Sequence, residues 1–143
     1  MTDKLTAMLV DHEDLRTKPY RCTAGKLTIG VGRNLDDRGI SPDEAMYMLA
    51  NDIRDSRKEL SASFPWFDKL DEVRQSVLID MNVNLGLSRL KGFRNTLALI
   101  GVGKYEAAAV EMLDSKWAQQ VGRRAKRLSG MMATGRWRHG PRN

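Results

Sequence analysis

The chain has 143 residues, of which 24 are Lys or Arg, 18 are Asp or Glu and one is Cys. This length predicts one domain that buries its own core, and 41% hydrophobic with 29% charged residues excludes a wholly disordered chain. The single cysteine excludes an intramolecular disulfide and a Cys-based zinc site, and no apolar run is long enough for a transmembrane helix. The N-terminus lacks the layout of a signal peptide, so we expect a soluble protein made inside a cell.

The net charge of +6 is unevenly distributed along the chain. Residues 1–114 carry 16 basic and all 18 acidic residues, whereas residues 115–143 carry eight basic residues and no acidic one. The eight are Lys116, Arg123, Arg124, Lys126, Arg127, Arg136, Arg138 and Arg142. Such a segment predicts a polyanionic partner, which the charge alone leaves open among nucleic acid, anionic lipid and an anionic cell-wall polymer.

The first third of the chain predicts one helix and one small sheet. Leu5, Met8 and Leu9 recur at helical spacing after Thr2, a plausible N-cap, and predict a helix over residues 3–12. Pro19 then excludes a regular helix. A turn at 23–25, an alternating strand at 26–33 and a loop at 34–39 follow, so we expect the sheet near residues 20–35.

The rest of the chain reads as helix. Ser41 as N-cap, Pro42 at the first helical position and Glu44 three residues after the cap predict a helix from 42 to about 63. Further helices are predicted at 69–85, 94–100, 104–114 and 116–134. The fold class is therefore α+β and mainly helical, with a small sheet-bearing lobe and a larger helical lobe joined by the long helix.

Three side chains near the N-terminus could carry chemistry. Glu13 stands where the first helix ends, Cys22 on the turn into the strand, and Thr28 on the strand. If they converge, the carboxylic acid could protonate a leaving oxygen while the other two position an attacking water. The alternative, which spacing alone leaves open, is a solvated carboxylate, a small buried thiol and a residue chosen for strand propensity.

A resemblance to a known family decides between these readings. The chain resembles the lysozymes of T-even bacteriophages, family 24 of the glycoside hydrolases, and the similarity is collinear over nearly its whole length. It is carried by Met8-Leu9, Glu13, Leu15-Arg16, Tyr20, Thr28 to Gly32, Ser41 to Leu49, Phe67 to Arg74, Ala108 to Val110, Ser115 to Trp117, Arg124 to Arg127 and Thr134 to Trp137.

The family pattern of Glu, eight residues, Asp or Cys, five residues and Thr falls on Glu13, Cys22 and Thr28. The resemblance implies that Glu13 is the general acid and that Cys22 and Thr28 hold the hydrolytic water on the opposite face of the sugar, giving inversion. Asp is commoner than Cys at this position. Because a free thiol is mostly neutral at pH 7, we favour water orientation over a thiolate base for Cys22.

The resemblance also implies supporting residues. Arg124 matches an arginine that pairs with the catalytic glutamate, and Arg33 with Asp52 matches a structural ion pair. Trp117 and Trp137 match packing positions in the helical lobe, most methionines are expected in the core, and His12 on the surface. The substrate-binding candidates are Asn34, Val83, Thr96, Glu111 and Arg124.

As a whole, the resemblance implies one lysozyme domain over residues 1–143, with a small lobe at about 13–60 and a helical lobe at about 1–12 and 61–143. It implies a monomeric endolysin, without metal or cofactor, that hydrolyses the β-1,4 bond between N-acetylmuramic acid and N-acetylglucosamine in peptidoglycan. We expect it in the host cytoplasm until a holin releases it to the wall.

Two alternatives remain at this stage. A lytic transglycosylase would cut the same bond without adding water, and a basic protein would bind a polyanion or disturb a membrane through its C-terminal helix. Binding to nucleic acid is not expected, since no recognition-helix module or stacking platform is present in the sequence.

Overall fold

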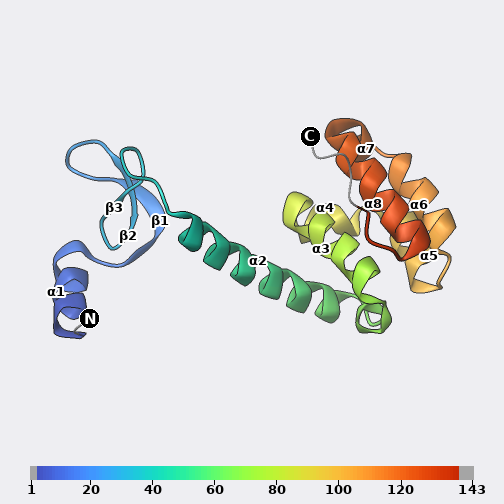
Figure 1. Ribbon diagram of the computed structural model, residues 1–143, viewed down its shortest axis with the longest axis horizontal. Coiled ribbons are helices and arrows are strands. Elements are labelled where there is room, and N and C mark those ends of the chain that lie inside the picture. The colour runs from blue at the N-terminus through green and yellow to red at the C-terminus, as the bar shows by residue number, and fades with distance from the viewer. Residues whose placement is uncertain (1–2, 139–143) are drawn as a thin grey trace. The chain divides into compact units, whose positions relative to one another are not determined.

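The computed structural model describes residues 3–138 (Figure 1), and within that range it confirms a mainly helical α+β fold. Its elements are α1 (Asp3–Glu13), β1 (Arg16–Arg21), β2 (Leu27–Gly30), β3 (Arg33–Asn34), α2 (Pro42–Ser63), a short 3-10 turn (Phe67–Lys69), α3 (Glu72–Leu85), α4 (Leu87–Lys91), α5 (Arg94–Gly101), α6 (Tyr105–Leu113), α7 (Lys116–Val121) and α8 (Arg123–Thr134). The chain divides into two compact units, residues 1–49 and 50–143, with the boundary inside α2. The predicted lobe limits, which assign residues 1–12 to the helical lobe, stay a prediction.

The first unit contains α1 and a three-stranded antiparallel sheet in the order β1-β2-β3. The sheet begins earlier than the sequence predicted, because residues 16–21 form the edge strand β1. Pro19 fits there since an edge strand tolerates a missing donor, and the pairing with β2 is irregular between Arg16 and Tyr20.

The helix predicted at 3–12 is confirmed as α1, although its proposed N-cap, Thr2, lies outside the described residues. Glu13 is its last residue. Asp14 then takes a left-handed conformation with φ of 66° while its N–H donates to the carbonyl of Val10 at 2.8 Å. This turn ends the helix and sends the chain into β1, which leaves the Glu13 side chain at the helix end.

The predicted start of α2 is confirmed by a capping box. The N–H of Ser41 donates to Glu44 Oε1 at 2.8 Å, and the N–H of Glu44 donates to Ser41 Oγ at 3.2 Å. The ion pair predicted between Arg33 and Asp52 is wrong, because both terminal nitrogens of Arg33 bind Glu44 instead. Asp52 lies eight residues further along α2, roughly 12 Å at the helical rise, whereas Glu44 is in the first turn beside the loop from β3.

The second unit contains the apolar core. Fully buried side chains from α3, α5, α6 and α8 meet there, among them Val77, Met81, Ile100, Met112 and Met132. The helices α6 and α8 lie side by side, and α3 also packs against α8 (Figure 1).

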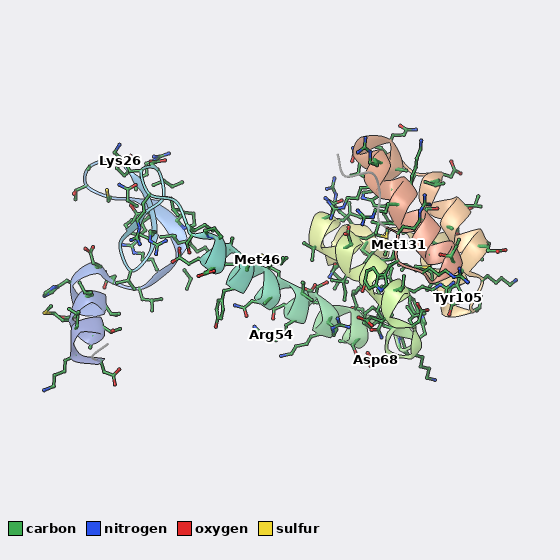
Figure 2. All side chains as sticks on the ribbon, viewed as in Figure 1. Lys26, Met46, Arg54, Asp68, Tyr105 and Met131 are labelled. Atoms are coloured by element: carbon green, nitrogen blue, oxygen red, sulfur yellow. The ribbon has the colours of Figure 1, made fainter. Side chains whose placement is uncertain are left out.

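Arg74 on α3 ties the end of α8 to the rest of the second unit. Its guanidinium donates to the carbonyls of Met132 and Ala133. It also lies 3.7 Å from the ring centroid of Tyr105, which stands at the start of α6 and is labelled in Figure 2. It therefore satisfies carbonyl groups that the last turn of a helix leaves unpaired.

Some predictions for the helical part need correction. The helix predicted over 116–134 is two helices, because Gly122 takes φ of 51° between α7 and α8. The short helix α4 was not predicted. Trp117 is buried as expected, but Trp137 is 54% exposed and is not a core residue.

Predictions about surface and core residues have mixed outcomes. His12 is exposed as predicted. Among the described methionines, those of the second unit are buried, whereas Met8, Met46 and Met48 are exposed. Arg142 of the basic segment lies outside the described residues.

Candidate active site

The β1–β2 hairpin brings Cys22 and Thr28 together. The N–H of Cys22 donates to the carbonyl of Lys26 at 2.9 Å, and the N–H of Gly25 donates to the carbonyl of Cys22 at 2.8 Å, so Cys22 begins a tight turn. Thr28 stands on β2 opposite Tyr20 of β1, two residues before Cys22. The carbonyl of Lys26 also accepts a hydrogen bond from the Thr28 hydroxyl, so one oxygen holds both Thr28 and the half-buried Cys22 at this end of the hairpin.

Hydrogen bonds from the turn favour the ionised form of this cysteine. Backbone groups of Lys26 and Ala24 are the main causes that hold the pKa of the Cys22 thiol below its ordinary value, with a smaller contribution from the Thr28 side chain. Partial desolvation acts in the opposite direction but is outweighed. The turn, which Lys26 closes (labelled in Figure 2), is thus a local environment in which the thiolate form is favoured more than it is in water.

Thr28 is the one buried residue of the first unit among those the structure describes. Its side chain is 3% exposed, and its hydroxyl donates to the carbonyl of Lys26 at 2.8 Å. That bond fixes the rotamer and leaves the oxygen lone pairs free to accept a hydrogen bond from a water.

The carboxyl group of Glu13 lies against Gly32. A Cβ built on Gly32 would stand 2.8 Å from both Cδ and Oε1 of Glu13, closer than any real side chain tolerates. Gly32 also has φ of 71°, which favours glycine. The backbone connects this contact to the hairpin, since Gly32 follows Thr28 by four residues.

Asn34 lies on the same sheet, directly opposite Thr28 in the β2–β3 ladder. Its amide donates to Asp37 Oδ2 at 3.0 Å, and its carbonyl oxygen accepts from the N–H of Asp37 at 3.0 Å. Four candidates (Glu13, Cys22, Thr28 and Asn34) therefore belong to the first unit.

The other four candidates belong to the second unit. Thr96 and Glu111 line a cavity of about 450 Å³ between α4–α5 and α6–α7, whereas Val83 is 46% exposed outside that lining. Thr96 is buried and lies at the wall of this cavity. Arg124 binds Asp80 of α3, with 2.7 Å between Nε and Oδ1, and its pairing with Glu13 stays a prediction.

Sequence reasoning missed two contributors to this geometry. It did not assign Gly32 to the support of Glu13, and it gave Glu44 only a capping role. A signal for Gly32 was present, because a glycine within a strand pattern often marks close approach of another group, and Gly32 lies inside the strand predicted at 26–33. Nothing in the sequence indicates that Glu44 both caps α2 and binds Arg33.

Comparison with known proteins identifies the family. The sequence profile described as phage lysozyme matches residues 10–136, which covers most of the chain and both units. The chain belongs to the phage lysozyme family. Two similar proteins from Dictyostelium discoideum are named probable T4-type lysozyme 2 and probable T4-type lysozyme 1. They are 28% and 24% identical to this chain, and each alignment covers 94% of the chain and 96% of the relative.

A third relative shows the same domain inside a larger protein. The pre-baseplate central spike protein Gp5 of Enterobacteria phage T4 is 24% identical over 92% of this chain, which spans 28% of that protein. As a member of the phage lysozyme family, the chain is a glycoside hydrolase of the muramidase type, and its substrate is peptidoglycan.

Two further findings concern the described residues only. No group of three or more His, Cys, Asp or Glu residues in positions 3–138 could hold a metal ion. Within the same range, every helix is too short or too polar to cross a membrane.

Proposed function

We propose that this phage-lysozyme-family enzyme is an endolysin that hydrolyses the β-1,4 bond between N-acetylmuramic acid and N-acetylglucosamine with inversion. The observation that carries the proposal is the convergence of Cys22 and the buried Thr28 on one hairpin, where the carbonyl of Lys26 accepts hydrogen bonds from both the N–H of Cys22 and the hydroxyl of Thr28. In this mechanism, the side chains of Cys22 and Thr28 together bind one water molecule. A carboxylic acid, Glu13, lies at the end of the preceding helix in the same unit.

In the proposed reaction, the protonated carboxyl of Glu13 donates its proton to the glycosidic oxygen as the bond to the anomeric carbon breaks. The water held by Cys22 and Thr28 attacks that carbon from the opposite face and loses a proton. The glycosidic oxygen gains a hydrogen and the anomeric carbon gains a hydroxyl group, so the elements of one water molecule are added across the broken bond. Because the pKa of the Cys22 thiol is lowered, we propose that Cys22 also accepts this proton as a thiolate, a role beyond the water orientation that the sequence favoured.

Product analysis on purified peptidoglycan tests this proposal. Wild type is expected to release reducing N-acetylmuramic acid ends that appear first as the inverted anomer, and Glu13→Gln is expected to release almost none. Wild-type activity in Glu13→Gln would overturn the assignment of the acid. Anhydromuramic ends would instead identify a lytic transglycosylase, and a retained anomer would exclude the positioned-water mechanism.

We also propose that Asn34, Val83, Thr96, Glu111 and Arg124 contact the glycan. Support comes from the cavity that Thr96 and Glu111 line together, which has the size of a small-ligand site. Thr96→Ala is expected to raise KM for peptidoglycan fragments by about threefold, corresponding to one lost neutral hydrogen bond, with kcat nearly unchanged. An unchanged KM would remove Thr96 from the substrate contacts.

The biological role follows as a separate proposal from the family membership. We propose that the enzyme is made in the host cytoplasm, acts as a monomer, and reaches the wall when a holin opens the inner membrane. Expression with and without a holin tests this: lysis is expected only with the holin. Lysis of equal speed without it would contradict the proposal.

Contact with an anionic membrane is a secondary proposal for the basic helix α8. Arg123, Lys126 and Arg127 are exposed on it, but its apolar residues Leu128 and Met131 are buried in the second unit. A folded enzyme could therefore bind lipid through charge but not by inserting this helix. Co-sedimentation with anionic vesicles is expected to disappear at high salt, and binding that survives high salt would contradict it.

A further inference from the structure

The ion pair between Arg33 and Glu44 is built more firmly than a surface pair. The terminal nitrogens of Arg33 donate to both carboxylate oxygens of Glu44, at 2.7 Å to Oε1 and 2.5 Å to Oε2. Arg33 Nη1 also donates to the carbonyl of Gly39 at 3.1 Å. Such a bidentate contact fixes the direction of the side chain as well as its charge.

Glu44 is held in turn by the start of α2. Its Oε1 accepts the N–H of Ser41, so that one oxygen serves both the capping box and the ion pair. The contacts with Arg33 and Ser41 lower the pKa of Glu44 to about 2, and those with Glu44 raise the pKa of Arg33. Both groups therefore stay charged throughout the pH range in which a general acid could work.

Arg33 is also fixed through its backbone, and this places Gly32. Arg33 pairs with Ile29 in the β2–β3 ladder. Gly32 is the residue directly before it, and the Glu13 carboxyl occupies the space in which a Cβ on Gly32 would stand. A continuous path thus runs from the first turn of α2 through Glu44 and Arg33 to the surface beneath Glu13.

From this path we propose that Arg33 and Glu44 are positioning residues for Glu13: their ion pair holds Gly32 in the place that sets the position of the carboxyl group. This inference rests on the proposed role of Glu13 as general acid and adds to it. Neither Arg33 nor Glu44 needs to touch the substrate. Breaking the pair frees Gly32 to shift, and a carboxyl displaced by about 1 Å loses on the order of 100-fold in rate.

The test compares Arg33→Gln with wild type by steady-state kinetics on soluble peptidoglycan fragments, at a temperature where both are fully folded by circular dichroism. We expect kcat to fall at least tenfold while KM changes by less than about threefold, because only the placement of the acid is lost. Arg33→Lys, which retains the charge and one bond to Glu44, is expected to recover part of kcat.

A matched control separates positioning from stability. Arg74 in the second unit is also a mostly buried arginine with a carboxylate partner, and its side chain is 14% exposed compared with 21% for Arg33. Arg74→Gln is expected to lower the melting temperature but to leave kcat of the folded enzyme within about twofold. An equal loss of kcat in both variants would show that general destabilisation is responsible and would overturn the inference.

The pair itself is tested by a double-mutant cycle. If Arg33 and Glu44 act through one contact, kcat should fall to a similar extent in Arg33→Gln, in Glu44→Gln and in the double variant. The loss in the double variant should then be smaller than the product of the two single losses. Independent, multiplicative losses would overturn the inference. Wild-type kcat in Arg33→Gln, together with an inactive Glu13→Gln, would also overturn the inference but would leave the proposed function intact. An active Glu13→Gln would refute the proposed function instead.

Discussion

Replacing Gly32 with alanine should inactivate the enzyme by moving one carboxyl group. The new Cβ would lie 2.8 Å from Cδ of Glu13, whereas two carbon atoms in contact are separated by about 3.5–4.0 Å. The Glu13 carboxyl must therefore retreat by about 1 Å, and we expect kcat to fall on the order of 100-fold.

Gly30→Ala is the matched control for this substitution. Gly30 has φ of 72°, almost the same as the 71° of Gly32, but a Cβ there meets nothing within 4 Å. Both variants should lose roughly 1–2 kcal/mol of stability from the left-handed backbone, so thermal melting should rank them together. Only Gly32→Ala should lose activity in a peptidoglycan turbidity assay. Equal activities of the two folded variants would refute the reasoning about Glu13.

Other predictions concern pH and stability. Because the pKa of Glu44 is lowered to about 2 from an ordinary 4.5, its contribution to stability is complete above about pH 4.5 and is lost as the pH falls towards 2. Acid unfolding of Glu44→Gln should therefore show a weaker pH dependence in that window, and an unchanged curve would argue against the pair. Arg74→Ala removes two carbonyl contacts to α8 and the contact with Tyr105 and should cost about 3–5 kcal/mol, measured by urea unfolding; a loss below about 1 kcal/mol would be inconsistent with this role. Cys22→Asp should keep activity and extend it to lower pH, because a carboxylate ionises below a thiol. An unchanged pH–rate profile would mean that ionisation at this position does not limit the reaction.

The helices could be predicted from sequence wherever their end signals are local. The capping box of Ser41 and Glu44 located the start of α2, because both partners lie within four residues and their bonds depend only on the local backbone. The strand at 16–21 was missed because its pairing with β2 is a non-local contact and Pro19 obscures the strand pattern. The break at Gly122 was missed because a glycine inside a helical pattern is compatible with either continuation or a turn.

The sequence allowed the identity of the site residues to be predicted better than the partners that they contact. The spacing of Glu13, Cys22 and Thr28, interpreted through the family resemblance, named three residues, and the structure joins Cys22 and Thr28 through a hairpin. The partner of Arg33 was predicted wrongly because the choice between Glu44 and Asp52 depends on where the loop after β3 meets α2. Three-dimensional placement decides such a contact, and the linear pattern does not contain it.

The tie between Arg74 and the end of α8 has a consequence for how the chain is made. Its hydrogen bonds join residues that are 58 and 59 positions apart. Such contacts form only after a long loop has closed, so they favour late completion of the second unit. During synthesis, α3 to α6 leave the ribosome before α8 can pack against α6 and α3 and complete the core. A nascent chain halted before residue 123 should consequently remain sensitive to protease, and resistance should appear only once α8 has emerged.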